Sequence, residues 1–291
     1  MKIALFPSHG SLNSKPVFGA LIDHLKEKNE NIMIDRCDDS CDVAVIWSVL
    51  WRGRMEQNKK IWEFFRRQNK PVVVLEVGGI KRNVTWKMGI NGINRDADFA
   101  NQEIIEDRWP KFKIEMKPWK QTGNVIVICG QHDNSEQWLG KPKMPKWTVQ
   151  QIQELRKFTD KPILVRPHPR NQFTINEKEF KDVKIKVPNR DYNTYDDTDF
   201  KKTLQSTWAV INHSSNPAME AVFSGIPVFV SQSSLCYDVG NHSLGDIKTP
   251  SMPNRAKWAN WLSYTEWTVQ EIREGLPWVR IRNRLLERYI K

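Results

Sequence analysis

Pro71-Val72-Val73-Val74-Leu75 is a continuous β-branched run, typical of a parallel strand that is covered on both faces. Weaker apolar patterns lie upstream of it, and they predict alternating strands and helices at residues 2–6, 16–28, 32–35, 42–47 and 54–68. Strands that alternate with helices imply right-handed crossovers between parallel strands. Residues 1–120 are therefore predicted to form a Rossmann-like α/β domain.

A second Rossmann-like domain is predicted for residues 121–275, beginning with the buried strand Val125–Cys129. Thr148 is expected to cap its first helix, and Gly225 to end a later one. The remaining strands and helices are expected at residues 148–158, 163–165, 183–187, 197–205, 209–211, 217–224, 227–230, 254–262, 268–274 and 279–290. The C-terminal helix, within residues 276–291, is treated as a separate element.

The stretch between the two strand-rich regions has no clear periodicity. Residues 78–119 are rich in Gly, Asn, Trp and charge, so we expect an irregular functional loop region there. Residues 117–123 are predicted to be the hinge between the domains.

Composition describes a soluble protein. Of 291 residues, 39% are hydrophobic and 27% charged, and no apolar run reaches membrane-spanning length. The strand-like start at Lys2 argues against a signal peptide, so a cytoplasmic protein is expected, in the host cytoplasm if a phage encodes it. A monomer is assumed. Cys37 and Cys41 have zinc-like spacing, but no second ligand pair follows, so the four cysteines are expected to be free thiols.

The chain is basic, with 45 Lys and Arg against 34 Asp and Glu, a formal charge of +11. Such an excess favours an acidic partner, although a merely solubilising surface explains it equally well. Several of the 13 tryptophans adjoin basic residues, as in Trp51-Arg52 and Trp86-Lys87. Aromatic rings beside cations suit sugar faces or nucleobases.

Polar residues follow predicted strands of the second domain, where open parallel sheets bind ligands. Gly130-Gln131 follows the first strand, and Arg166-Pro167-His168-Pro169-Arg170 follows the next. Asn212-His213-Ser214-Ser215 precedes a helix with Pro217 in its first turn and Glu220 further in. Ser214 and Ser215 could bind phosphate at this helix start, and Glu220 could reach a ribose diol. A rigid turn and plain helix capping are the alternatives.

These motifs resemble the donor-binding half of GT-B glycosyltransferases, above all capsular polysaccharide transferases and bacterial sialyltransferases, over residues 125–230. Size and charge also resemble bacteriophage DNA glucosyltransferases. The resemblance implies two Rossmann-like domains facing a cleft, with the C-terminal helix crossing back to the first domain. It implies that His168, Ser214, Ser215 and Glu220 bind the donor, a UDP- or CMP-sugar used as co-substrate, with no tightly bound cofactor.

No Asp-x-Asp motif follows a predicted strand, because Asp38-Asp39 and Asp196-Asp197 have loop-like surroundings. A metal-independent and inverting transfer is therefore preferred. Inversion needs a general base from the first domain, and the candidates in order are Glu76, Asp96 and His9. Each could instead bond nearby backbone or arginines.

Two acceptors are considered for this transferase. A hydroxymethylated pyrimidine in double-stranded DNA is mildly favoured, with Trp51, Arg52, Lys81, Arg82 and Trp86 as its binding residues. A capsular or lipid-linked glycan at the membrane surface is the alternative. A nucleotide-sugar epimerase and a non-catalytic nucleic-acid-binding module are the other hypotheses.

Overall fold

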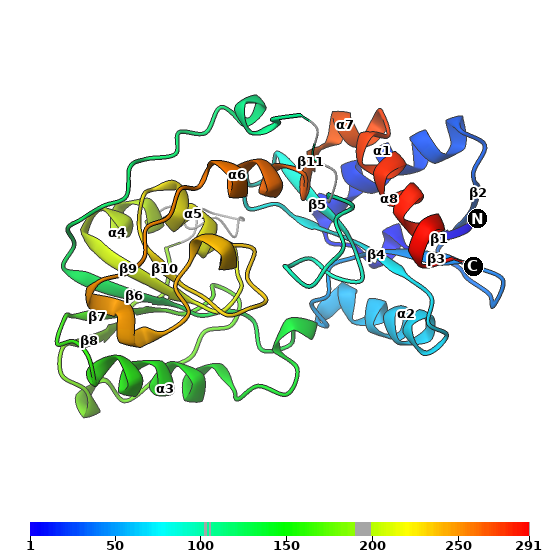
Figure 1. Ribbon diagram of the computed structural model, residues 1–291. Coiled ribbons are helices and arrows are strands. Elements are labelled where there is room, and N and C mark those ends of the chain that lie inside the picture. The colour runs from blue at the N-terminus through cyan, green and yellow to red at the C-terminus, as the bar shows by residue number, and fades with distance from the viewer. Residues whose placement is uncertain (102–103, 105, 190–198, 291) are drawn as a thin grey trace. The chain divides into compact units, whose positions relative to one another are not determined.

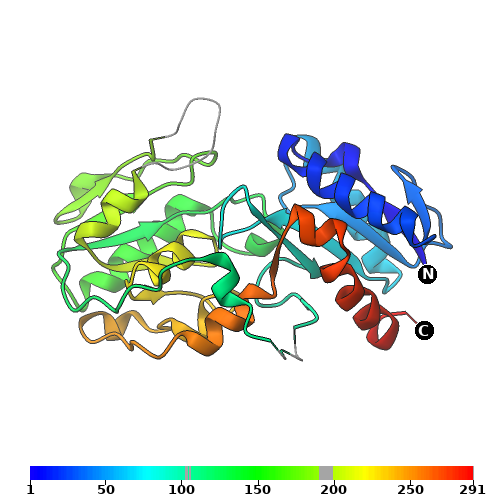
Figure 2. The ribbon, with the colours of Figure 1, turned by 90° about the horizontal axis from the view of Figure 1, so that it is seen from above.

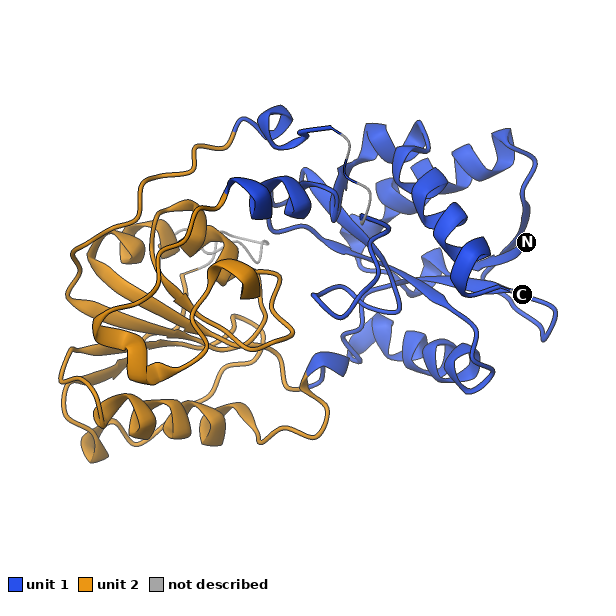
Figure 3. Ribbon diagram, in the orientation of Figure 1, with its two compact units in different colours: residues 1–113, 134–137, 256–291 blue, residues 114–133, 138–255 orange. Residues whose placement is uncertain are grey.

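The computed structural model describes residues 1–101, 104, 106–189 and 199–290. Two units make up the chain (Figure 3). Unit 1 comprises Met1–Lys113, Asn134–Gln137 and Ala256–Lys291, and unit 2 comprises Ile114–Asp133 and Trp138–Arg255. Each unit has one mainly parallel sheet with helices, which is the predicted fold class.

The sheet of unit 1 has the strand order β11-β5-β4-β3-β1-β2. The parallel part consists of β1 (Lys2–Leu5), β2 (Asn31–Ile34), β3 (Val43–Trp47) and β4 (Val72–Val77). All were expected from their apolar runs. Alternate side chains of β4 enter opposite cores, since Val73 and Leu75 pack on one face and Val72 and Val74 on the other.

Helices cover both faces of this sheet. Helices α1 (Lys15–Glu27), α7 (Val269–Arg273) and α8 (Leu276–Arg288) contribute to one core, and α2 (Glu56–Arg67) contributes to the other. Figure 2 shows α1 in blue and α8 in red over the same face. Trp278, Ile281 and Leu285 of α8 are buried against unit 1. The C-terminal helix therefore packs on the first unit, as expected.

The expectation of an irregular region over residues 78–119 is wrong in part. Residues Thr85–Ile90 form β5, a fully buried strand antiparallel to β4. A second antiparallel strand, β11 (Glu266–Thr268), extends the sheet beyond β5. Lys87, which is 2% exposed, and Gly89 interrupt the apolar pattern of β5 and explain why it escaped prediction.

The chain returns to unit 1 at Ala256, where α6 (Ala256–Ser263) begins, rather than at residue 276. A buried carboxylate explains the earlier return: Glu266 accepts hydrogen bonds from the backbone N–H groups of Gly79 (2.7 Å) and Ile80 (2.9 Å). Arg108 adds an ion pair to Glu271 and stacks on Trp267, 4.0 Å from the ring centroid. These contacts make the segment after Ala256 part of the first core.

The sheet of unit 2 is entirely parallel, with the order β10-β9-β6-β7-β8 (Figure 1). Its strands are β6 (Val125–Cys129), β7 (Ile163–Arg166), β8 (Val183–Ile185), β9 (Thr207–Asn212) and β10 (Val228–Phe229). Helix α3 (Met144–Arg156) lies on one face, and α4 (Phe200–Ser206) and α5 (Pro217–Phe223) lie on the other (Figure 1). The predicted start of α4 at residue 197 lies outside the described residues.

Two expectations for unit 2 are corrected. Helix α3 begins at Met144, so Thr148 is a buried residue inside the helix and not its cap. The predicted hinge belongs to unit 2: the N–H of Lys117 bonds Phe223 O (2.9 Å), and Arg255 donates to Lys117 O (2.6 Å). Gly225, with φ +75°, ends α5 as predicted.

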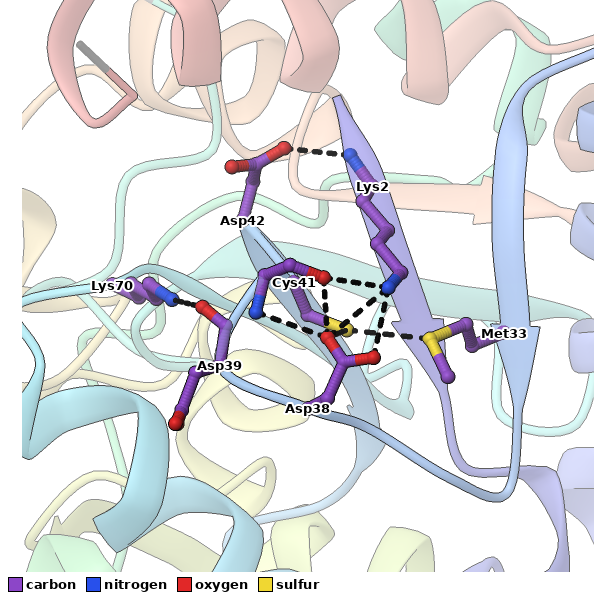
Figure 4. Close-up of polar contacts among 8 residues, drawn as sticks. Lys2, Met33, Asp38, Asp39, Cys41, Asp42 and Lys70 are labelled. Atoms are coloured by element: carbon purple, nitrogen blue, oxygen red, sulfur yellow. Dashed lines mark hydrogen bonds and ion pairs between the residues drawn. The ribbon is translucent and has the colours of Figure 1, made fainter.

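The Cys37–Cys41 region holds an ion-pair cluster (Figure 4). Lys2 Nζ contacts both Asp38 carboxylate oxygens, at 2.9 and 3.1 Å, and the Cys41 thiol lies 3.6 Å from Met33 Sδ. Hydrogen bonds from Ser40 and Lys2 lower the pKa of Asp38. All four cysteines are free.

Candidate functional site

Three strands of unit 2 end level with one another. Cys129 of β6 pairs with Arg166 of β7 on one side and with Asn212 of β9 on the other. The residues that follow these positions therefore lie at one sheet edge, where parallel sheets bind ligands. The sequence motifs at residues 130–131, 167–170 and 213–215 are brought together as their positions in the sequence implied.

Gln131 links two of these strand ends. Its Oε1 accepts hydrogen bonds from the backbone N–H of Ser214 (3.2 Å) and from its hydroxyl (3.4 Å), and both residues are 5% exposed. Asn171 Nδ2 donates to Gln131 O (3.1 Å), which connects the loop after β7. Both donors of Ser214 are thus used within the protein.

Ser215 is arranged differently from Ser214. Asn212 Nδ2 donates to Ser215 Oγ (2.7 Å), so the oxygen serves as an acceptor and its own proton is left to donate. Ser215 is half-buried, whereas Asn212 is 2% exposed. Of the two serines, Ser215 is the one whose hydroxyl can donate to a bound oxygen anion.

His168 is also set up as a donor. Its Nδ1 accepts a hydrogen bond from the backbone N–H of Arg170 (3.1 Å), which places the proton of the neutral ring on Nε2. The ring packs edge-on against His132, with 5.7 Å between centroids. A Cβ at Gly130 would lie 3.4 Å from the backbone nitrogen of His168, so the loop after β6 packs closely against the loop after β7.

Arg166 was expected to bind the donor, but the structure commits it elsewhere. Its guanidinium is 3% exposed, pairs with Asp199 at 2.5 Å and lies over Phe200. Lys186 also contacts Asp199, at 3.0 Å. This buried pair fixes β7 to α4, and it holds the Arg166 guanidinium away from the sheet edge.

Glu220 lies half-buried in α5, which has seven residues. A macrodipole sums over the peptide units of its helix, so a helix this short adds little to phosphate binding. The hydroxyl and imidazole donors therefore carry more of the expected anion binding than the helix does.

His213 lies in the motif at residues 212–215, but it was not expected to bind the donor. It follows β9, and its Nε2 lies 3.5 Å from the hydroxyls of both Ser231 and Ser233, which follow β10. Burial, with a smaller contribution from Lys141, lowers its pKa to about 4. The sequence does contain polar residues directly after both β9 and β10, and this pattern could have pointed to His213.

In unit 1, two of the three candidate bases share an edge. His9 follows β1 and Glu76 lies near the end of β4, and these strands run parallel through β3. The imidazole Nδ1 of His9 is enclosed and has no partner among the described residues, while Glu76 Oε1 accepts from Val77 N (2.8 Å).

Asp96 lies at the opposite edge. It follows β5, whose last residue, Ile90, pairs with Val73 at the beginning of β4. The antiparallel direction of β5 thus carries residue 96 away from His9 and Glu76. Because β5 was not predicted, the sequence could not separate these candidates.

The expected DNA-binding residues fall into two groups. Trp51 and Trp86 are 9% and 3% exposed and belong to the cores of unit 1, so they offer no ring to a flipped base. Arg52, Lys81 and Arg82 lie in the loops after β3 and β4, at the same edge as His9.

No group of three or more metal-ligating side chains occurs among the residues that the structure describes. Asp196-Asp197 lies outside them. In the same part of the chain, no helix is long and apolar enough to span a bilayer.

Neither a protein-family model nor a curated protein matches this sequence. Solved structures do match. The chain is similar to KpsC of Thermosulfurimonas dismutans, a beta Kdo 2,7 transferase, with 12% identity and a TM-score of 0.54 over 96% of this chain and 100% of that chain. It is also similar to the beta Kdo 2,4 transferase of the same organism's KpsC, with 13% identity and a TM-score of 0.52 over 95% and 98%. The likeness shows the fold, a two-unit GT-B-like architecture.

Proposed function

We propose that the chain is a glycosyltransferase that takes its sugar from a nucleotide-sugar donor bound at the strand ends of unit 2. The observation that carries the proposal is the level arrangement of β6, β7 and β9, which presents the His168 Nε2–H and the Ser215 hydroxyl at one edge. Two hydrogen-bond donors of this kind suit the oxygens of a phosphate or diphosphate leaving group. The fold shared with two Kdo transferases supports the same class of reaction.

Unit 1 supplies the acceptor side in this proposal. His9 and Glu76 share the carboxyl edge of its sheet, and either could take the proton of an acceptor hydroxyl in an inverting transfer. Asp96 is left out because it lies at the other edge.

A carbohydrate acceptor is now favoured over DNA. The case for DNA rested partly on Trp51 and Trp86 as stacking surfaces, and both side chains are buried. The two proteins of similar fold are named as Kdo transferases, and neither name refers to DNA.

The deciding experiment incubates the protein with UDP- and CMP-sugars and three acceptor samples: glycan oligosaccharides, hydroxymethylated duplex DNA and no acceptor. Mass spectrometry of the products should show sugar added to a glycan, and the reaction should persist in excess EDTA. Isomerised donor without acceptor would instead establish an epimerase. Failure to bind or turn over any nucleotide-sugar would overturn the proposal.

A further inference from the structure

A cluster of polar side chains joins the ends of β9 and β10 in unit 2. We define it by His213, Ser231 and Ser233 and call it the His213 cluster. Ser231 Oγ lies 2.9 Å from His213 O and 2.9 Å from Ser233 Oγ, and His213 Nε2 lies 3.5 Å from both hydroxyls. It adjoins Ser214 and Ser215 in sequence, but the expected donor site did not include it.

Counting protons fixes the direction of these bonds. Ser231 donates its single hydroxyl proton to the carbonyl of His213, so the 2.9 Å contact with Ser233 requires Ser233 to be the donor. Neither hydroxyl then has a proton left for the imidazole. From this network we assign the proton of the neutral ring to Nε2 and the lone pair to Nδ1.

Packing holds the ring in this arrangement. Trp138, which is 2% exposed, meets His213 edge-on with 5.0 Å between ring centroids. The Nδ1 atom forms no hydrogen bond with any residue that the structure describes, and it is not one of the enclosed polar atoms. The half-buried imidazole thus offers a fixed acceptor at the sheet edge.

We propose that His213 is a further ligand-binding residue of the donor site, whose Nδ1 accepts a hydrogen bond from an O–H or N–H group of the nucleotide-sugar. The inference rests on the proposed function and deepens it. The low pKa of His213 supports the assignment, since a ring that stays neutral at pH 7 is an acceptor and not a cation.

The chemistry separates His213 from its neighbours. His168 and Ser215 present protons and suit phosphate oxygens, whereas a neutral acceptor repels a phosphate lone pair and suits a donor group. Away from its phosphates, a nucleotide-sugar has three kinds of donor group: the hydroxyls of the transferred sugar, the hydroxyls of the ribose and the N–H groups of the base. Cytosine has an exocyclic amine and uracil has an N3–H, so the free nucleotides and the nucleotide-sugars of both bases distinguish these sources.

Calorimetry on the full chain tests the proposal with CMP, UDP and the CMP- and UDP-sugars that wild type binds. The variant His213→Phe keeps an aromatic ring against Trp138 and removes both nitrogens. His242→Phe is the matched control, because His242 is an exposed histidine of unit 2 that stacks on Tyr237 instead. Ser233→Ala replaces His213→Phe if that variant does not fold. It removes one of the hydroxyls beside Nε2, so it should weaken the affinity for the same ligands about 2- to 3-fold.

A hydroxyl of the transferred sugar as ligand predicts that His213→Phe weakens the nucleotide-sugars about 10-fold and leaves free CMP and UDP unchanged. The cytosine amine predicts an equal loss for CMP and CMP-sugars and none for UDP compounds, and uracil N3–H predicts the reverse. A ribose hydroxyl predicts an equal loss for all of these ligands. If the tested variant, His213→Phe or its replacement Ser233→Ala, binds every ligand with wild-type affinity, the assignment of His213 is overturned. The proposed function is then unaffected. If the wild-type protein binds none of these ligands, both the assignment of His213 and the proposed function are overturned.

Discussion

Units 1 and 2 both place polar residues after parallel strands, but they connect them differently. In unit 2, side chains from separate loops bond one another: Gln131 holds Ser214, and Asn171 holds Gln131. In unit 1, Glu76 bonds the backbone N–H next to it, and His9 Nδ1 has no partner among the described residues. Unit 2 thus has a preorganised edge, while the candidate bases of unit 1 are held locally. A preorganised site loses less conformational freedom when it binds a ligand.

The largest expected effect tests whether Arg166 belongs to the framework of unit 2. Arg166→Met removes the guanidinium that pairs with the buried Asp199 carboxylate, and the free energy of unfolding should fall by about 3–5 kcal/mol. Lys186→Met removes the more exposed partner of the same carboxylate and should cost less than about 1 kcal/mol. Chemical denaturation measures both. Unchanged stability together with lost nucleotide binding would return Arg166 to the donor site.

His168→Ala should act on binding and not on folding. Losing the Nε2–H donor to a phosphate should weaken nucleotide affinity by about 1.5–3 kcal/mol, roughly 10- to 100-fold. Calorimetry gives the affinity and thermal unfolding gives the stability, with His242→Ala as the control. An intact affinity would mean that the preorganised edge is not the donor site.

The pH dependence of the free energy of unfolding tests whether His213 is buried at the edge of unit 2 as a neutral ring. Its folded pKa of about 4 lies below the ordinary 6.5, so the unfolded state binds the proton more tightly. Stability from this residue is fully present above pH 6.5 and is lost as the pH falls from 6.5 towards 4. For a half-buried ring we expect about 1–2 kcal/mol. Unfolding at pH 7 and pH 4.5 should show a smaller difference for His213→Phe than for wild type; equal differences contradict the shift.

Substitutions of Ser214 and Ser215 should have different effects on stability and on nucleotide binding. Ser215→Ala removes the hydroxyl that can donate outward, and it should weaken nucleotide binding by about 1 kcal/mol, or roughly 5-fold. Ser214→Ala removes one internal bond to Gln131, and it should lower stability by a similar amount while affinity stays near wild type. Equal losses of affinity in the two variants would show that both serines contact the ligand.

The smallest expected effect concerns unit 1 and DNA. With a glycan acceptor, Lys81→Gln combined with Arg82→Gln should leave the weak, non-specific duplex binding and its salt dependence nearly unchanged. The pair Lys26→Gln in α1 and Lys28→Gln at its C-cap removes the same charge at the other edge of the sheet. If gel shifts across salt show that only the first pair flattens the log–log slope by about 2, Lys81 and Arg82 bind DNA phosphates and the preference for a glycan acceptor is contradicted.

Much of unit 2 could be predicted because its strands are apolar runs that end in motifs. Val125–Cys129 and Ile163–Val165 were expected, and the level strand ends brought their motifs together. The chemistry of each residue at that edge was not accessible. Arg166 looks like a phosphate ligand in the sequence, and only folding shows that Asp199 neutralises it.

Unit 1 was harder to predict because its sheet changes direction. Lys87 and Gly89 mask the pattern of β5, and the partner of β5 comes from Glu266–Thr268, far along the chain. Without that antiparallel strand, Asp96 ranked above His9 as a candidate base. Local hydrophobic patterns predict most strands of this chain. When a strand is missed, however, they cannot show at which edge of the sheet the loop after it lies.

The return of the chain to unit 1 after Ala256 has a consequence for synthesis. All residues of unit 2 have been translated once Arg255 is added, whereas unit 1 still lacks α6, β11, α7 and α8 at that moment. The loop at Gly79 and Ile80 must wait for Glu266, a carboxylate made 187 residues after Gly79. During translation unit 2 can therefore finish folding before unit 1, and a nascent unit 1 exposes the β5 edge until Glu266–Thr268 have been made.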